Sequence, residues 1–109
     1  MRTEAQEQSA FFKTARLILP KHLRGLLFAS MNGAMMHGGR AGQMAKCQGM
    51  VNGVPDIQFA WPVGKFHGLF IEMKRTKEAG DSKVSAEQQK MLDDLDAAGY
   101  KTAVCYGCD

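Results

Sequence analysis

Two carboxylates and a lysine near the middle of the chain have the residue types and the spacing of a metal-dependent hydrolytic site. Fifteen residues separate Asp56 from Glu72, and Lys74 follows Glu72 by two positions. Side chains two positions apart in a strand share one face, so the Glu72 carboxylate and the Lys74 ammonium group are expected about 7 Å apart along the backbone. If Asp56 begins the neighbouring strand of a hairpin, its carboxylate reaches the same side.

This triple suits hydrolysis of a phosphodiester bond with a divalent cation. Two neighbouring carboxylates raise each other's pKa unless a cation compensates their charge, and Mg²⁺ or Mn²⁺ accepts carboxylates, a carbonyl group and waters as ligands. Such an ion polarises the phosphoryl oxygen and lowers the pKa of a bound water. Lys74 would orient that water or stabilise the developing charge. A surface hairpin with an ion-pair cluster of purely structural role can carry the same three residues. These residues alone therefore do not distinguish a hydrolytic site from a structural ion-pair cluster.

Alternation of hydrophobic and polar residues predicts two strands, over residues 54–61 and 68–74, joined by a turn around residues 63–65. In the first strand, Asp56 lies on the face opposite Trp61. In the second strand, the candidate acid and lysine lie opposite an apolar face. The two strands therefore bring the three candidate residues to one side of a hairpin.

A first helix is predicted over residues 3–19, where Pro20 ends it. Its apolar stripe includes Glu4 near the centre, whereas Glu7 lies at the edge. A carboxylate that faces inward is costly unless it is paired or binds a cation. Glu4 is therefore a candidate for the site, and the alternative is that it lies in an exposed first turn.

The sequence Ser85-Ala86-Glu87-Gln88 is a capping box that starts a second helix, and Gly99 is a natural stop for it. The residues on its inward face are Gln88, Met91, Leu92, Leu95 and Ala98. Gln88 is either the capping residue alone or also a residue of the site.

The remaining segments are a short apolar run over residues 26–30, a glycine- and methionine-rich loop over 31–50, and a last strand over 101–106. The run over 26–30 predicts a buried strand, and the loop includes one helical turn near residues 43–47. The order of helix, strand, loop, hairpin, helix and strand indicates an α/β fold with a mixed β-sheet flanked by α-helices.

A length of 109 residues argues for one small domain, residues 1–109. With 45% hydrophobic and 23% charged residues, the composition excludes a disordered or coiled-coil protein. No apolar run approaches the roughly 20 residues that cross a bilayer, and the N-terminus has no secretory signal. The cysteines, Cys47, Cys105 and Cys108, are odd in number and fit a reducing compartment, so we expect a cytoplasmic protein.

The net charge of +3 is unevenly distributed, because six basic residues and no acid lie between Gln8 and Pro55, while acids cluster later in the chain. This distribution predicts a face that attracts polyanions. Arg40, Lys46 and Arg75 are the candidate contacts to phosphate groups of such a polyanion.

The motif order resembles that of the PD-(D/E)xK nucleases, in which a Pro-Asp pair precedes a Glu-x-Lys triplet. More closely, about residues 3–107 resemble the virus-type replication-repair nuclease (VRR-NUC) family. The motifs that carry this resemblance are Gly53-Val54-Pro55-Asp56-Ile57, Gly68 to Lys74, Ser85-Ala86-Glu87-Gln88, Leu95 to Tyr100, the Glu4-x-x-x-Gln8 helix and the Met31-Asn32-Gly33 turn.

The resemblance implies a restriction-endonuclease-like fold and a Mg²⁺- or Mn²⁺-dependent DNA endonuclease. The site residues that it implies are Asp56, Glu72 and the main-chain carbonyl of Met73 as metal ligands, Lys74 as the catalytic lysine, Glu4 as an extra acid acting directly or through water, and Gln88 as the helix glutamine that faces the site. Gln8 would support them. Free-standing family members are similar to Holliday-junction resolvases, which implies a homodimer that cuts branched DNA in a bacterial or phage-infected cell.

Two other readings stay open. A non-catalytic, structure-specific DNA-binding protein would keep the same fold and use the acids and the lysine as a structural ion-pair cluster. A zinc-stabilised binding module would use Cys105 and Cys108 with Cys47 and His37. The simpler interpretation of Cys105 is a small buried residue in the last strand.

Overall fold

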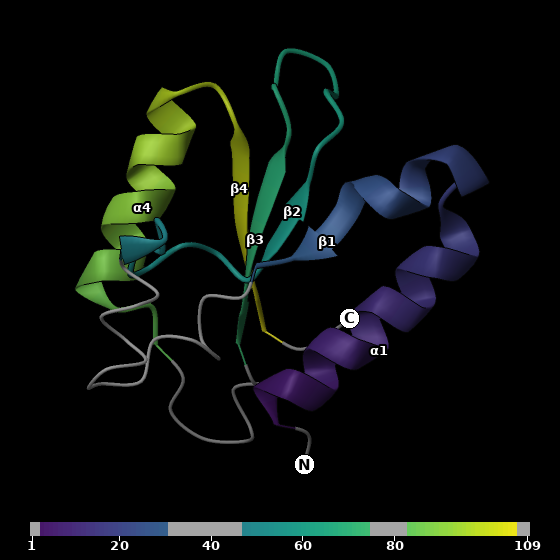
Figure 1. The fold of residues 1–109 in the computed structure, drawn as a ribbon, viewed down its shortest axis with the longest axis horizontal. Coiled ribbons are helices and arrows are strands. Elements are labelled where there is room, and N and C mark those ends of the chain that lie inside the picture. The colour runs from purple at the N-terminus through teal and green to yellow at the C-terminus, as the bar shows by residue number, and fades with distance from the viewer. Residues whose placement is uncertain (1–2, 31–46, 75–82, 107–109) are drawn as a thin grey trace.

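The computed structural model describes residues 3–30, 47–74 and 83–106 (Figure 1). Its elements are α1 (Glu4–Ile18), the 3₁₀ helix η1 (Lys21–Leu26), β1 (Leu27–Ala29), β2 (Ile57–Phe59), β3 (Leu69–Lys74), α4 (Ala86–Ala97) and β4 (Lys101–Tyr106). The strands form one sheet in the order β1-β2-β3-β4. This arrangement confirms the predicted α/β fold with a mixed sheet and flanking helices.

The sheet combines an antiparallel half with a parallel pair. β1 pairs with β2 and β2 with β3 in antiparallel register, with Ile57 opposite Ile71. β3 and β4 are parallel, with Glu72 opposite Val104, because α4 carries the chain back to the starting edge between them. β3 is thus a central strand, and four of its six residues are buried.

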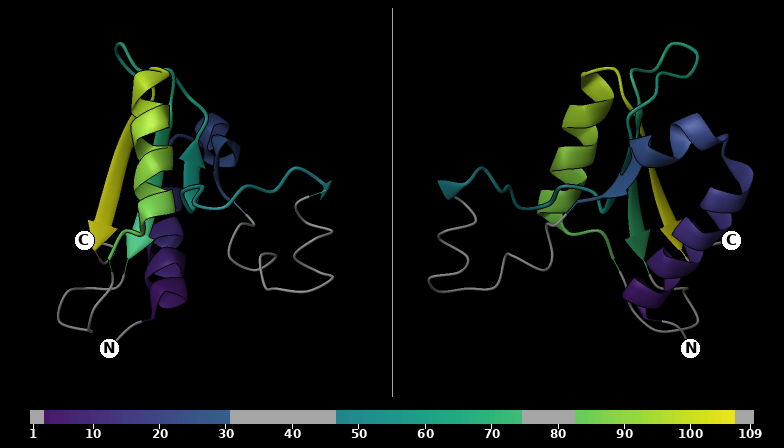
Figure 2. Two further views of the ribbon diagram at one scale, coloured as in Figure 1. Left: turned by 90° about the vertical axis from the view of Figure 1, so that its left-hand side faces the viewer. Right: turned by 45° about the vertical axis from the view of Figure 1, so that its right-hand side comes forward.

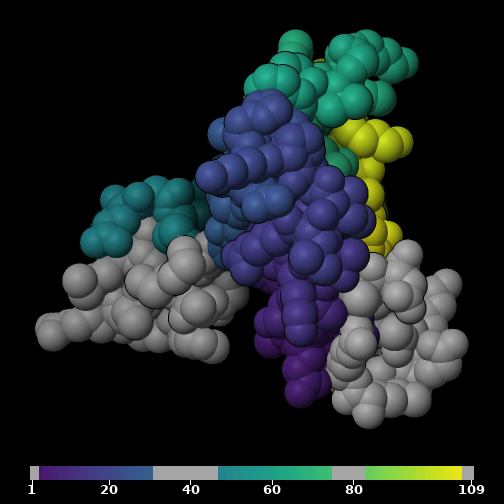
Figure 3. All heavy atoms as spheres, turned by 90° about the vertical axis from the view of Figure 1, so that its right-hand side faces the viewer, coloured from purple at the N-terminus to yellow at the C-terminus, as the bar shows by residue number. Residues whose placement is uncertain are grey.

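Helix α1 covers the face of the sheet that carries the apolar side chains of β3. Phe11 and Phe12 pack against a core of Ile57, Ile71 and Met73. The helix begins with a capping box at its N-cap, Thr3, and ends before Pro20. In the space-filling view, α1 and η1 form one continuous side of the molecule (Figure 3).

The prediction that Glu4 is the inward-facing acid of this helix is wrong. Glu7 is the buried acid, with 4% of its surface exposed, whereas Glu4 is exposed. Glu7 lies one turn before Phe11 on the same side of the helix, and Phe11 packs against the core. The packing of α1 on the sheet therefore turns Glu7 inward, and Glu4 lies in the open first turn.

Helix α4 lies on the other side of the sheet from α1 and is adjacent to β4 (Figure 2). Its capping box starts at Ser85 as predicted, and Leu92 is its buried residue. Gly99 follows the helix with a φ of 98°, which is the left-handed conformation expected at a helix C-terminus.

The two N-terminal strands differ from the predictions. β2 is limited to Ile57–Phe59, and Trp61 lies beyond it, partly exposed. Pro62 follows and has no N–H to continue the ladder. β1 is not buried, because it is the outer strand of the sheet, and η1, which precedes it, was not expected. The predicted turn at residues 43–47 lies outside the described residues, except for Cys47.

Among the parts of the chain that the structure describes, no helix has the length and the apolar character needed to span a membrane.

Candidate active site

Asp56 lies immediately before β2, and main-chain contacts on both sides hold its position. The N–H of Met73 in β3 donates to Asp56 Oδ2 at 2.9 Å. On the other side, the N–H of Ser30 donates to the main-chain oxygen of Asp56 at 2.8 Å, and the Ser30 hydroxyl donates to the carbonyl of Pro55 at 2.8 Å. The carboxylate of Asp56 is thereby directed toward β3, as the hairpin prediction requires.

Glu72 and Lys74 share the face of β3 that is turned toward α4. Both side chains are almost completely buried, with 2% and 7% of the residue surface exposed. Lys74 Nζ lies 3.7 Å from Glu72 Oε1. Burial of a charged pair in this way is favourable only when further hydrogen bonds satisfy the remaining polar atoms.

Gln88 supplies those hydrogen bonds from the first turn of α4. Its Nε2 donates to Glu72 Oε1 at 2.7 Å, and its Oε1 accepts from Lys74 Nζ at 3.1 Å. The same Oε1 accepts from the N–H of Ser85 at 2.9 Å, which is the capping-box contact. The two interpretations of Gln88 are therefore not alternatives, because one side chain caps the helix and joins the acid to the lysine.

The other oxygen of Glu72 has no hydrogen-bond partner. Oε2 is buried, and it is the one buried side-chain oxygen or nitrogen in the described part of the chain that lacks a partner. Burial, the negative charge of Asp56 and that of Glu4 raise the pKa of Glu72 to about 7, although the Lys74 charge and a main-chain hydrogen bond from Asp56 oppose them. Burial also raises the pKa of Asp56, against the effect of the Met73 N–H. The cluster therefore has an excess of negative charge.

These observations fit a hard divalent cation. A buried carboxylate oxygen with no donor, beside a second carboxylate, offers the oxygen ligands that Mg²⁺ and Mn²⁺ prefer. Within the described residues, no three His, Cys, Asp or Glu side chains gather closely enough to hold a metal by themselves. A cation here would therefore rely on two carboxylates together with main-chain oxygen and water.

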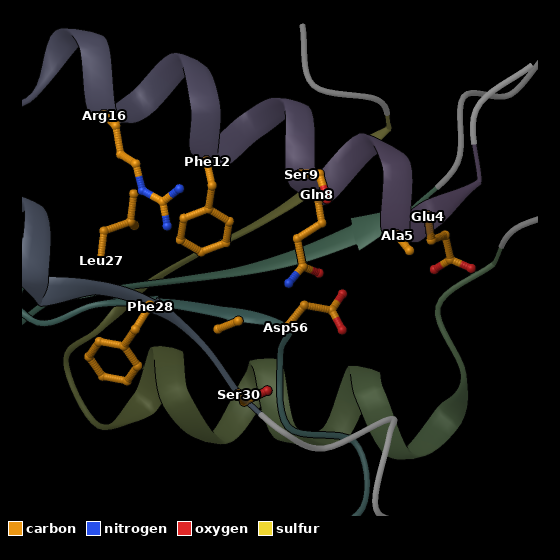
Figure 4. Close-up of a pocket in the computed structure, with 11 residues that line it drawn as sticks. Glu4, Ala5, Gln8, Ser9, Phe12, Arg16, Leu27, Phe28, Ser30 and Asp56 are labelled. Atoms are coloured by element: carbon orange, nitrogen blue, oxygen red, sulfur yellow. The ribbon is translucent and has the colours of Figure 1, made fainter.

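An open groove of about 770 Å³ runs from Asp56 between α1 and β1. Glu4 lies at the same end as Asp56, and the carboxamide of Gln8 points toward Asp56 (Figure 4). Although Glu4 is exposed, its charge acts on both Asp56 and Glu72. The first helix thus brings an acid and an amide to the same end of the groove as Asp56.

Arg40, Lys46 and Arg75 lie outside the described residues. Cys105 in β4 is half-buried and packs against the core, and Cys47 is exposed.

Sequence reasoning missed Ser30, which contacts both Pro55 and Asp56. It also missed Gly53, which allows a close contact between chain segments that are distant in sequence. The glycine within the Gly53-Val54-Pro55-Asp56 run was a signal that could have pointed to that contact.

Comparison with known proteins agrees with this geometry. No curated protein matches the chain. A solved structure described as a VRR-NUC domain protein superposes with a TM-score of 0.77 at 25% sequence identity, covering 99% of this chain and 80% of that one. The family model of the VRR-NUC domain matches residues 26–109, which include Asp56, Glu72, Lys74 and Gln88. The chain belongs to the VRR-NUC family.

Proposed function

We propose that this protein is a Mg²⁺- or Mn²⁺-dependent DNA endonuclease that acts on branched DNA as a homodimer. Its family indicates a nuclease of the PD-(D/E)xK type. The observation that carries the proposal is the buried, unpartnered Oε2 of Glu72, which lies in a cluster with the Asp56 carboxylate and the Lys74 ammonium group. Such a cluster is costly for a merely structural ion pair and is suited to a cation.

In this proposal Asp56, Glu72 and the main-chain carbonyl of Met73 hold the cation, and Glu4 contributes through a water. The bound ion would polarise the phosphoryl oxygen and lower the pKa of the attacking water. The residues of the chain itself orient the reacting groups and exclude water from the site. Gln88 fixes Lys74 Nζ and leaves Glu72 Oε2 for the cation, so that the ammonium group stands ready to orient the nucleophile or stabilise charge on the phosphate.

The choice of DNA structure over DNA sequence is supported by the similarity of free-standing members of this family to Holliday-junction resolvases. The basic stretch between Gln8 and Pro55 supplies charge for a polyanion. Arg40, Lys46 and Arg75 remain the proposed DNA contacts. An exposed thiol at Cys47 supports a cytoplasmic location.

The test is cleavage of a labelled four-way junction beside a matched linear duplex, in Mn²⁺ and in Mg²⁺. The inactivating variant is Lys74→Ala. Its control is Lys90→Ala, which removes an exposed lysine that pairs with Asp94 on α4. We expect wild type and Lys90→Ala to cut the junction and Lys74→Ala to lose activity. Light scattering of the free protein should give the mass of a dimer.

Each other outcome has a definite meaning. Equal cutting of junction and duplex would keep the chemistry and overturn the preference for branched DNA. Binding of the junction without cleavage in either metal would establish the non-catalytic DNA-binding protein instead. Residual activity in Lys74→Ala equal to that of Lys90→Ala would remove Lys74 from the mechanism.

A further inference from the structure

The groove between α1 and β1 is continuous with the candidate active site. Asp56 lines one end, and Arg16 lies at the other, along the side of α1 (Figure 4). Glu4 and Arg16 are separated by twelve residues of helix, which corresponds to about 18 Å along the helix axis. The groove is therefore long enough for a segment of an extended chain, and not only for a single small molecule.

Charge changes sign along this groove. Glu4 and Asp56 make one end acidic, which suits a cation, whereas Arg16 makes the far end basic. The guanidinium group of Arg16 lies 5.7 Å from the centre of the Phe12 ring. Among the described residues, no carboxylate pairs with it. An arginine that lies beside an aromatic ring and has no carboxylate partner among the described residues is suited to binding an anion.

The wall between the two ends combines apolar surface with main-chain groups. Phe12 and Leu27, which pack against the core, supply the apolar surface. Phe28 of β1 pairs with Gln58 of β2, and its ring lies on the face of β1 that is turned away from α1 (Figure 4). The main-chain groups of its neighbour Ala29 point toward the outer edge of the sheet that the structure describes. Ala29 also lines the groove, and peptide N–H groups are contacts that the phosphates of a nucleic acid can use.

We propose that this groove holds the nucleic-acid strand next to the bond that is cut, with Arg16 bound to a phosphate and the main chain of β1 at Ala29 beside the strand. The proposal rests on the proposed nuclease function and assigns the direction in which the strand leaves the site. The groove would recognise the sugar-phosphate backbone of the nucleic acid, because an arginine–phosphate contact carries no sequence information. Arg16 is thus a substrate-binding residue, and Asp56 lies where the groove meets the candidate active site.

The charge pattern favours a nucleic acid over a peptide as the occupant. Arg16 on α1 is followed in the chain by Lys21 and Arg24 on η1, and these two helices form one side of the molecule in Figure 3. No acid lies between Gln8 and Pro55 to oppose them. A strand that enters the site meets this basic side first, and its cleaved phosphate meets the acidic end, where a cation compensates the repulsion.

The experiment compares Arg16→Gln with Lys13→Gln in steady-state cleavage of the labelled four-way junction in Mn²⁺. Lys13 is an exposed cation on the same helix that does not line the groove. We expect Arg16→Gln to raise KM about five- to tenfold with little change in kcat, because the phosphate contact is present in ground and transition states alike. The slope of log KM against log salt concentration should fall by about one. Lys13→Gln should change neither quantity to that extent.

Thermal melting of each variant checks that the fold is retained.

The failures of the two proposals are distinguishable. If wild type cuts the junction while Arg16→Gln matches Lys13→Gln in KM and salt slope, the groove is not the path of the strand and the nuclease function stands. If wild type does not cut in any metal, the nuclease function fails and the strand assignment with it.

Discussion

The Cα of Gly53 lies against the main chain of Glu87 so closely that a Cβ at position 53 would be 2.7 Å from the carbonyl oxygen of Glu87. Gly53 also has a φ of 85°, which only glycine adopts readily. This contact joins the segment that leads to Asp56 to the first turn of α4, which presents Gln88. The absence of one side chain therefore sets the distance between two parts of the candidate active site.

We predict that Gly53→Ala weakens metal binding and cleavage beyond its effect on stability. The positive φ should cost about 1–3 kcal/mol of unfolding free energy, and the new Cβ must push the Asp56 segment away from α4. Gly49→Ala is the matched control, because Gly49 has a φ of 99° with nothing within 4 Å of the added Cβ. Both variants should lose stability, but only Gly53→Ala should lose most of the Mn²⁺-induced rise in melting temperature. An equal loss of the Mn²⁺-induced rise in melting temperature in both variants would contradict this role of Gly53.

A second prediction separates the two tasks of Gln88. Gln88→Ala and Gln6→Ala each remove the N3 side chain of a capping box, and each should cost about 1 kcal/mol of stability. Only Gln88 also contacts Glu72 and Lys74. Gln88→Ala should therefore lower the cleavage rate about tenfold or more, because Lys74 loses its fixed position, while Gln6→Ala should cleave like wild type. If the two variants have the same rate, Gln88 acts as a capping residue alone.

The parts of the fold that depend on neighbours in sequence were predictable. Alternation in β3 places Glu72 and Lys74 on one face, and the Ser85 capping box marks the start of α4. Both signals act over a few residues, so no knowledge of the packing was needed. The family motif then added the pairing with Asp56, whose orientation the structure confirms through the Met73 N–H.

The parts that depend on packing were not predictable. The choice between Glu4 and Glu7 as the buried acid depends on how far α1 is rotated on the sheet, and the two lie less than one turn apart. The close approach of Gly53 to Glu87 joins segments over thirty residues apart in sequence. The double role of Gln88 likewise needs α4 to lie over β3, which no local pattern encodes.

The raised pKa of Glu72 predicts how the metal-free protein responds to pH. The folded-state pKa of about 7 lies above the ordinary value of 4.5, so the folded state holds a proton that the unfolded state releases between these values. The stabilisation is complete below about pH 4.5 and is lost as the pH rises through about 7. Asp56, whose pKa is also raised, acts in the same direction.

The measurement is denaturant unfolding from pH 5 to pH 8 in the presence of a chelator. Wild type should lose stability across this range, and Glu72→Gln, which cannot ionise, should lose clearly less. Glu87→Gln, an exposed acid in the first turn of α4, is the control and should follow wild type. Parallel curves for wild type and Glu72→Gln would show that Glu72 is ionised throughout.

Asp56→Asn should abolish the stabilisation of the protein by Mn²⁺ while leaving the metal-free fold intact. A ligand present at one hundred times its Kd stabilises a protein by about 2.7 kcal/mol, and each kcal/mol raises the melting temperature of a domain of this size by roughly 4–8 °C. The amide of Asn still accepts the N–H of Met73, but it removes a negative charge from beside Glu72. The metal-free variant should therefore melt at or above the wild-type temperature.

Asp93→Asn is the control for this charge change, because Asp93 is exposed on α4 and contacts only Gln89 among the hydrogen bonds of the described side chains. Wild type and Asp93→Asn should show the same Mn²⁺-dependent rise, and Asp56→Asn should show none at the same concentration. A rise that persists in Asp56→Asn would move the cation away from this carboxylate. Since Glu72 Oε2 would then be the remaining buried oxygen without a donor, Glu72→Gln measured in the same way would decide whether the cluster binds the ion at all.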